Sequence, residues 1–305
     1  MTCSHLRRWA PLLLLASGLV FVGCDDDDDS LDEVENIADE LEDRSNYEEL
    51  EELLDAADLT GVLSGNGPFT VFAPNNAAVT AAADAVGSLS DAERRAVLLY
   101  HVLNGSQLSA ADINEGVTVV RNGYMGPNGE VVLLVRKDGS SVFVNGSSVV
   151  EADIEATNGV IHGIDQVLLP PNVVEIAQIL PNFSSLVGAL TQADGDLVSA
   201  LSADGPFTVF APNDAAFMQT ATGDLSSAQL ANVLQYHVVS GNVLSSDLMD
   251  GMTVTTLQGG TLTVNVNGEA VTIIDENGNT RRVVNANLQG TNGVVHEIDG
   301  VLLPN

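Results

Sequence analysis

The 305-residue chain contains only two cysteines, Cys3 and Cys24. Cys3 falls in a segment that has the composition of an export signal, so a processed chain would keep a single thiol. An internal disulfide is then excluded, even though exported proteins often contain them. We therefore expect the folded part to depend on hydrophobic cores for its stability.

Aromatic and basic residues are also scarce. Phe, Trp and Tyr make up 4% of the chain, which argues against a platform of exposed rings for stacking carbohydrate or bases. Ten Lys and Arg stand against 42 Asp and Glu, giving a formal net charge of −32. Such an excess of negative charge makes nucleic acid an unsuitable partner.

No apolar run is long enough to span a bilayer, which takes about 20 residues. The longest apolar stretch near the start, 12–22, follows the basic residues Arg7 and Arg8 and ends at "FVGC", as a signal peptide does. This ending resembles the lipobox of bacterial lipoproteins and predicts a signal peptide at 1–23 with an acylated Cys24. An ordinary signal peptide cut at another bond is the alternative.

Five consecutive aspartates, Asp25–Asp29, follow the cysteine. Like charges in a row repel one another, so residues 24–33 are predicted to be an extended acidic tether. A calcium site is the other interpretation, but the run lacks the spaced ligands and turn glycine of a calcium loop.

The rest of the chain is a tandem duplication. "GPFTVFAPNNAAV" returns as "GPFTVFAPNDAAF", "LLYHVLNG" as "LQYHVVSG", and "TNGVIHGIDQVLLP" as "TNGVVHEIDGVLLP", in the same order. The three pairs predict two copies of one domain, at 34–170 and 172–305.

Each copy has helical spacing of apolar residues first and β-rich sequence later. Ser90 with Glu93, and Ser226 with Gln229, have the form of capping boxes ahead of the Tyr-His segment. The second halves are rich in Val, Ile and Thr and contain turn pairs: Asn122-Gly123, Asn128-Gly129, Asp138-Gly139, Asn145-Gly146, Asn267-Gly268 and Asn277-Gly278. Helices followed by hairpins predict an α+β fold.

Four histidines remain after the export signal: His101, His162, His237 and His296. Each stands alone among apolar residues, without the ligand spacing of a zinc site. His162 and Asp165 point to opposite faces of a strand, and no nucleophile elbow is present. We expect no catalytic site, metal or cofactor, and we expect His162 and His296 to be buried packing residues.

The repeated boxes and the Tyr-His pair between them resemble fasciclin domains. The resemblance implies a wedge of β-strands with packed helices and a role in adhesion rather than catalysis. In matrix members of the family, an Asp-Ile pair before the last box contacts integrins, and Asp153-Ile154 has that place here; the second copy has Asn287-Leu288. Ile154 packing in the core while Asp153 caps a turn is the alternative. Further adhesion candidates are Tyr100, His101, Tyr236 and His237.

Together these features predict a lipid-anchored protein of the cell envelope, exposed at the periplasmic face or the cell surface. It would act in adhesion or matrix contact. Its partners would be membrane lipid through Cys24 and a surface protein or matrix polysaccharide. The alternative function is binding of a small molecule or polysaccharide at the junction between the domains.

Overall fold

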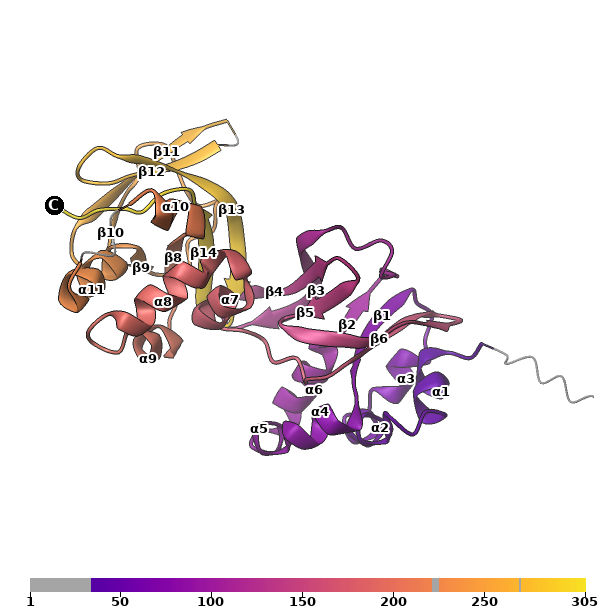
Figure 1. The fold of residues 1–305 in the computed structure, drawn as a ribbon. Helices are drawn as coiled ribbons and strands as arrows, with labels where there is room; N and C mark the ends of the chain where they lie inside the picture. The colour runs from indigo at the N-terminus through magenta and orange to yellow at the C-terminus, as the bar shows by residue number, and fades with distance from the viewer. Residues whose placement is uncertain (1–33, 221–224, 269) are drawn as a thin grey trace, which may run out of the picture. The chain divides into compact units, whose positions relative to one another are not determined.

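The computed structural model of the protein describes residues 34–220, 225–268 and 270–305. The predicted export signal and acidic tether, Cys24 included, lie outside the described residues. Two α+β domains follow, and the predicted fold class is confirmed (Figure 1).

The first domain opens with three helices and closes with a sheet. The helices are α1 (Ile37–Glu42), α2 (Glu48–Ala56) and α3 (Thr60–Leu63); then come β1 (Phe69–Pro74), α4 (Asn76–Ala81), α5 (Ala83–Gly87), α6 (Asp91–Tyr100), β2 (Val102–Asn104), β3 (Gly116–Gly126), β4 (Gly129–Asp138), β5 (Ser141–Val144), β6 (Ser147–Ala156) and β7 (Gly159–Ile164). The strand order is β2-β1-β7-β6-β5-β4-β3. Only β1 and β7 pair in parallel.

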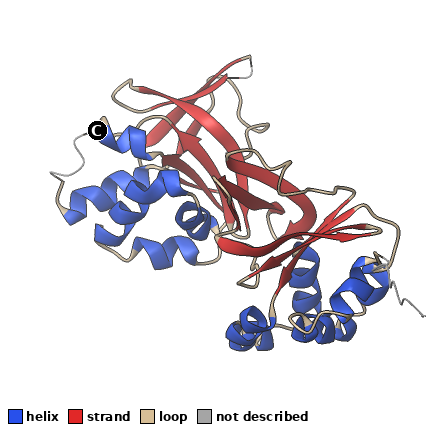
Figure 2. Cartoon of the chain, turned by 45° about the vertical axis from the view of Figure 1, so that its right-hand side comes forward, coloured by secondary structure: helices blue, strands red, loops and turns tan. Residues whose placement is uncertain are grey.

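The second domain repeats this plan. Its elements are α7 (Val173–Ile179), η1 (Pro181–Phe183), α8 (Ser184–Gln192), α9 (Leu197–Ser202), β8 (Phe207–Pro212), α10 (Asp214–Met218), α11 (Ser227–Tyr236), β9 (Val238–Ser240), β10 (Thr253–Thr255), β11 (Thr261–Asn267), β12 (Ala270–Ile274), β13 (Thr280–Gly290) and β14 (Gly293–Ile298). The sheet order is β10-β11-β12-β13-β14-β8-β9. Here β8, β9 and β14 take the places of β1, β2 and β7, so the two sheets have the same topology, given from opposite ends. Within each domain the helices gather against one side of the strands (Figure 2).

Each sheet is built around a strand buried on both faces. In β1, Val71 and Ala73 belong to the core cluster that the first helices cover, whereas Phe72 belongs to the cluster on the other face with Tyr100. Because alternate side chains of a strand point to opposite faces, one apolar strand serves both cores. In β8, Val209 and Phe210 divide in the same way.

The helix starts follow the sequence closely. Ser90 Oγ accepts the Glu93 N–H at 3.3 Å, and the Glu93 carboxylate accepts the Ser90 N–H at 2.8 Å. Ser226 and Gln229 form the same reciprocal pair at α11. Both predicted capping boxes are confirmed, and each fixes the start of the helix that carries the Tyr-His pair.

Five of the six predicted turn pairs join neighbouring strands, and Asn122-Gly123 does not. That pair lies inside β3, where the register against β4 shifts between Arg121 and Met125. The Asn122 side chain accepts the Tyr124 N–H and donates to the Tyr100 carbonyl. These two bonds form a local turn within the strand, so the pair makes a bulge instead of a hairpin.

Of the helices in the described part of the chain, none has by itself the length and apolarity to cross a bilayer. Val173–Ile179 and Pro181–Gln192 meet these criteria only when they are taken together, and they are bent by 107°.

Candidate functional site

The predicted contact pair, Asp153-Ile154, lies in a bulge of β6. The register between β6 and β7 shifts between Glu151 and Ile154, and Asp153 has a φ of 58°. The shift exposes Asp153 and turns Ile154, which is 7% exposed, into the core beneath the helices. The bulge therefore presents the carboxylate and uses the isoleucine as its anchor.

His162 supports this bulge from inside the sheet. Its Nδ1 accepts the Asp153 N–H at 3.2 Å, and its Nε2 lies 2.8 Å from the Leu108 carbonyl oxygen, to which it donates. The ring stacks on Phe72 with centroids 5.7 Å apart. Burial lowers the pKa of His162, since the charged ring would be desolvated.

The second copy has the same arrangement without the carboxylate. His296 accepts the Asn287 N–H at 3.3 Å, donates to the Val243 carbonyl at 2.9 Å, and stacks on Phe210. Asn287 has a φ of 61°, close to that of Asp153. The histidine is thus common to both bulges, and the exposed carboxylate of Asp153 has no counterpart at Asn287.

The Tyr-His pairs are buried at the ends of α6 and α11. His101 Nδ1 donates to the Val97 carbonyl at 2.7 Å, and its Nε2 accepts the Leu168 N–H at 2.9 Å. His237 makes the equivalent bonds to Val233 and Leu302. Burial lowers the pKa of each ring to about 4.

The tyrosines of these pairs are fixed as well. The Tyr100 hydroxyl donates to the Val132 carbonyl at 2.6 Å and accepts from the Asn145 amide at 2.8 Å. Tyr236 donates to the Thr261 carbonyl at 2.8 Å. Both side chains are 0% exposed, so a partner could reach neither tyrosine without unfolding the end of the helix.

These bonds decide what the histidines can do. Each of the four rings has both nitrogens bonded to backbone groups, which leaves neither nitrogen free as a base or a metal ligand. Asp165 bonds Ser147 and the Ser148 N–H instead of His162. Among the described residues, no group of three His, Cys, Asp or Glu is placed to hold a metal ion.

A second exposed carboxylate lies beside Asp153. Asp153 Oδ1 accepts the Ala110 N–H at 2.8 Å, and Asp112 Oδ2 accepts the Ser109 N–H at 3.3 Å and the Ser109 hydroxyl at 2.7 Å. Lys137 donates to the Ala110 and Ile113 carbonyls at 2.8 and 3.1 Å and so holds the same loop. We call Asp112 and Asp153 the carboxylate pair; both are exposed, and each is fixed through one oxygen.

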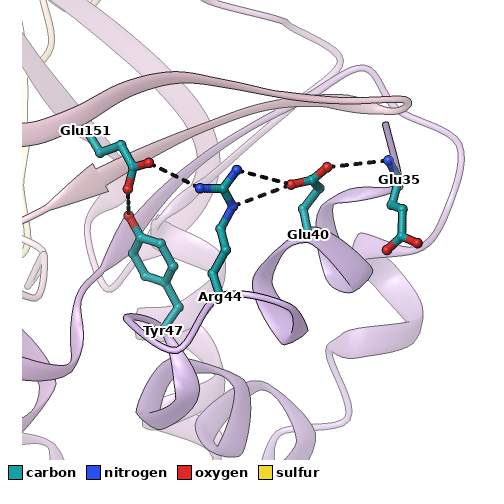
Figure 3. Close-up of polar contacts among 5 residues, drawn as sticks. All are labelled: Glu35, Glu40, Arg44, Tyr47 and Glu151. Carbon is teal, nitrogen blue, oxygen red and sulfur yellow. Dashed lines mark hydrogen bonds and ion pairs between the residues drawn. The ribbon is translucent and has the colours of Figure 1, made fainter. Parts of the chain in front are cut away.

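Glu151, two residues before Asp153, ties the bulge strand to the first helices (Figure 3). Its carboxylate accepts the Tyr47 hydroxyl at 3.1 Å and pairs with Arg44 at 3.1 Å, and Arg44 also pairs with Glu40 at 3.4 Å. Burial and the Glu151 charge raise the pKa of Tyr47 to about 12. The bulge is therefore braced on both sides, by His162 and by this cluster.

The cluster explains why the repeated box reads "HGID" in one copy and "HEID" in the other. A Cβ on Gly163 would lie 2.1 Å from the Tyr47 hydroxyl oxygen, so a side chain at this position clashes as long as Tyr47 is in place. The second copy has Phe183 in place of Tyr47, and the side chain of Glu297 bonds Asn213 at 2.9 Å. Each copy thus has one carboxylate at this place, from Glu151 of β6 in the first domain and from Glu297 of β14 in the second.

Asn158 and Asn292, in the "TNG" of the two boxes, are key residues that the sequence reasoning did not select. Asn158 accepts the Ile37 N–H at 2.9 Å and donates to the Leu63 and Gly65 carbonyls at 2.6 and 2.8 Å. Asn292 bonds Val173, Leu201 and Ala203 in the same way. The "TNG" sequence is the same in both copies, and this repetition is the feature of the sequence that could have pointed to the two asparagines.

Comparison with known proteins gives matches over both domains. The fasciclin domain model matches residues 45–170 and 181–304. Transforming growth factor-beta-induced protein ig-h3 of Sus scrofa is 30% identical over 254 residues, 79% of this chain and 35% of that protein. Periostin of Homo sapiens is 29% identical over 269 residues, 82% of this chain and 30% of that protein.

A cyanobacterial relative is shorter than these two. Protein sll1483 of Synechocystis is 40% identical over 139 residues, 43% of this chain and 73% of that protein. A solved structure of a FAS1 domain pair from the insect cell adhesion molecule fasciclin I has a TM-score of 0.47 at 20% identity, covering 83% of this chain and 92% of that one. The chain spans about a third of the length of ig-h3 and periostin. With the family model matched twice and in the order of the repeated boxes, the chain belongs to the fasciclin domain family.

Proposed function

We propose that this protein is an exported, non-enzymatic adhesion protein whose first domain contacts a surface protein through the carboxylate pair. Fasciclin-domain proteins act in cell adhesion and contact with the extracellular matrix. The observation that carries the proposal is the carboxylate pair itself. Asp112 and Asp153 are exposed and fixed on either side of one loop segment, Ser109–Ala110.

Preorganisation supports a binding role for this pair. Each carboxylate is held through one oxygen by backbone or hydroxyl donors, which leaves its other oxygen without a partner among the described residues. A side chain that is already ordered loses little conformational entropy when a partner binds it. In the second copy, Asn287 stands where Asp153 does, so the second domain offers only Asp247.

A double variant, Asp112→Asn with Asp153→Asn, tests the proposal without disturbing the fold. Asparagine retains the acceptor oxygen, and Asn287 already occupies the equivalent bulge. Asp84→Asn, an exposed change on α5, is the matched control. The chain would be immobilised on beads and offered to whole cells, with and without free matrix polysaccharides.

We expect the double variant to lower cell capture at least fivefold, which corresponds to about 1 kcal/mol of binding free energy. The thermal midpoint should stay within about 2 °C of the parent, and Asp84→Asn should leave capture unchanged. Equal capture by the parent and the double variant would refute the carboxylate contact. Competition by free polysaccharide that both proteins share would favour the alternative function instead.

We also propose that Cys24 carries a lipid anchor. The segment "FVGC" supports it, and more than one acyl chain would supply stable attachment, since each buried methylene contributes about 0.8 kcal/mol. Cys24→Ala should move the protein from the membrane fraction to the soluble fraction. Unchanged fractionation would rule out this anchor.

A further inference from the structure

The first domain contains an apolar hollow of about 130 Å³ between α2, α5 and α6. Apolar side chains line most of it: Leu50, Leu53, Val86, Val97 and Leu98. The buried ring of His101 also lines it, with both nitrogens already bonded. The hollow therefore has walls that favour an apolar occupant.

The second copy shows how the same place can be closed. Both capped helices are ten residues long, so Arg94 of α6 corresponds to Leu230 of α11. Leu230 is 7% exposed and belongs to the core that packs beneath α8. A leucine closes this position in one copy, and in the other an arginine lines the hollow.

Three further positions differ between the copies, one in exposure and two in residue type. Val167 lines the hollow and is partly exposed, whereas its counterpart Val301 is 0% exposed. Val79 stands where the second copy has Phe217, which packs against the core. Leu53 stands where the second copy has Ala189, and its larger side chain fills part of the hollow. The second copy keeps a hollow of only about 20 Å³ beside the equivalent residues Leu186, Leu234 and His237, against about 130 Å³ in the first copy.

The charged part of the lining is an ion pair. Arg94 and Asp91 both line the hollow and pair with each other, and the Asp91 side chain is 96% exposed. Solvent-exposed pairs of this kind are weak. A guanidinium also has five N–H donors, so it can bond a second carboxylate while Asp91 stays in place.

We propose that this hollow binds a small amphiphile with a carboxylate head and an apolar group of about six carbons. A cavity of roughly 150 Å³ accommodates benzene, so a hollow of about 130 Å³ suits an apolar group of about the size of that ring. The apolar group lies against Leu50, Val97 and Leu98, and the carboxylate lies at Arg94. This site is inside the first domain and is independent of the carboxylate pair.

Hexanoate, hexan-1-ol and hexylammonium are the probes, titrated separately into the full chain with its leucine and valine methyl groups followed by NMR. All three have six carbons, and the apolar tail of hexanoate is one methylene shorter than the tails of the other two, so tighter binding of hexanoate cannot come from its tail. We expect shifts at Leu50, Val97 and Leu98, with hexanoate binding about two to five times more tightly than hexan-1-ol and hexylammonium binding weakest. The absence of shifts at these methyl groups with every probe would overturn the proposal.

Two substitutions at Arg94 separate shape from charge. Arg94→Leu copies Leu230 and should abolish binding of all three probes. Arg94→Gln should retain hexan-1-ol binding and remove the preference for hexanoate. Arg282→Gln, an exposed arginine of β13, is the control and should change nothing.

Unaltered binding in Arg94→Leu, with its second-domain methyl spectrum intact, would refute the site. Hexanoate binding in the Asp112→Asn, Asp153→Asn double variant should equal that of the parent. If the adhesion proposal fails, the hexanoate site is therefore unaffected. If the hexanoate site fails, the adhesion proposal is equally unaffected.

Discussion

Acidification should destabilise both domains, and the titration of one buried histidine in each predicts how much. His101 and His237 are 3% and 2% exposed, and burial lowers the pKa of each to about 4. In the unfolded chain a histidine has a pKa of about 6.5. Because the folded pKa is the lower one, the unfolded state binds more protons between these values, and stability is lost as pH falls.

The size of the effect follows from these two pKa values. At pH 5 each histidine should cost its domain about 2 kcal/mol relative to pH 7, and the loss should approach about 3 kcal/mol below pH 4. For a domain of this length, about 2 kcal/mol corresponds to a fall of roughly 6–10 °C in the thermal midpoint. Relief of repulsion among the many carboxylates acts in the opposite direction.

Thermal unfolding of the parent and of a His101→Gln, His237→Gln double variant, followed from pH 7 to pH 4.5, separates these contributions. The variant should be less stable at pH 7, because glutamine cannot reproduce both ring bonds. Its midpoint should then fall less with pH than that of the parent, and the remaining fall comes in part from His162 and His296, whose pKa values burial also lowers. Parallel curves for the two proteins would refute the assignment of acid sensitivity to these rings.

Two further predictions concern residues of the repeated boxes. Asn158→Ala removes three hydrogen bonds that join α1 and the end of α3 to the start of β7. Urea unfolding should therefore show that the first domain loses about 2–4 kcal/mol of stability. An unchanged unfolding midpoint would contradict this role of Asn158. Gly163→Glu should destabilise the first domain by about 3 kcal/mol, because its Cβ meets the Tyr47 hydroxyl. Adding Tyr47→Phe and Glu151→Asn, which copies the second domain, should recover at least half of that loss in thermal unfolding. No recovery would show that the two copies do not exchange this carboxylate as described.

Local features were predictable because they depend on neighbours in the sequence. The capping boxes at Ser90 and Ser226 join residues three apart, and most turn pairs need only two residues with permissive backbone. The duplication then identified both Tyr-His helices. The bulge at Asn122-Gly123 could not be predicted in this way, because it depends on a hydrogen bond to Tyr100, which lies twenty-two residues away.

Features that depend on distant pairing were beyond the sequence. The bulge at Asp153 requires the register of β6 against β7, and only that register shows Ile154 turning inward. The Gly163-to-Glu297 difference in the boxes is explained by Tyr47, which lies more than a hundred residues before Gly163. Nothing in the sequence distinguishes Arg94 from other polar helix positions, because the hollow that it lines is formed only when α2, α5 and α6 pack together.

We propose that the Asp153 carboxylate, held on a bulge that His162 supports, makes the adhesive contact. The most direct measurement is cell capture by the Asp153→Asn single variant, with its thermal midpoint recorded on the same preparation. We expect the variant to lose capture while its midpoint stays within about 2 °C of the parent, because Asn287 occupies the same bulge in the second domain. Full capture by the folded variant would contradict it.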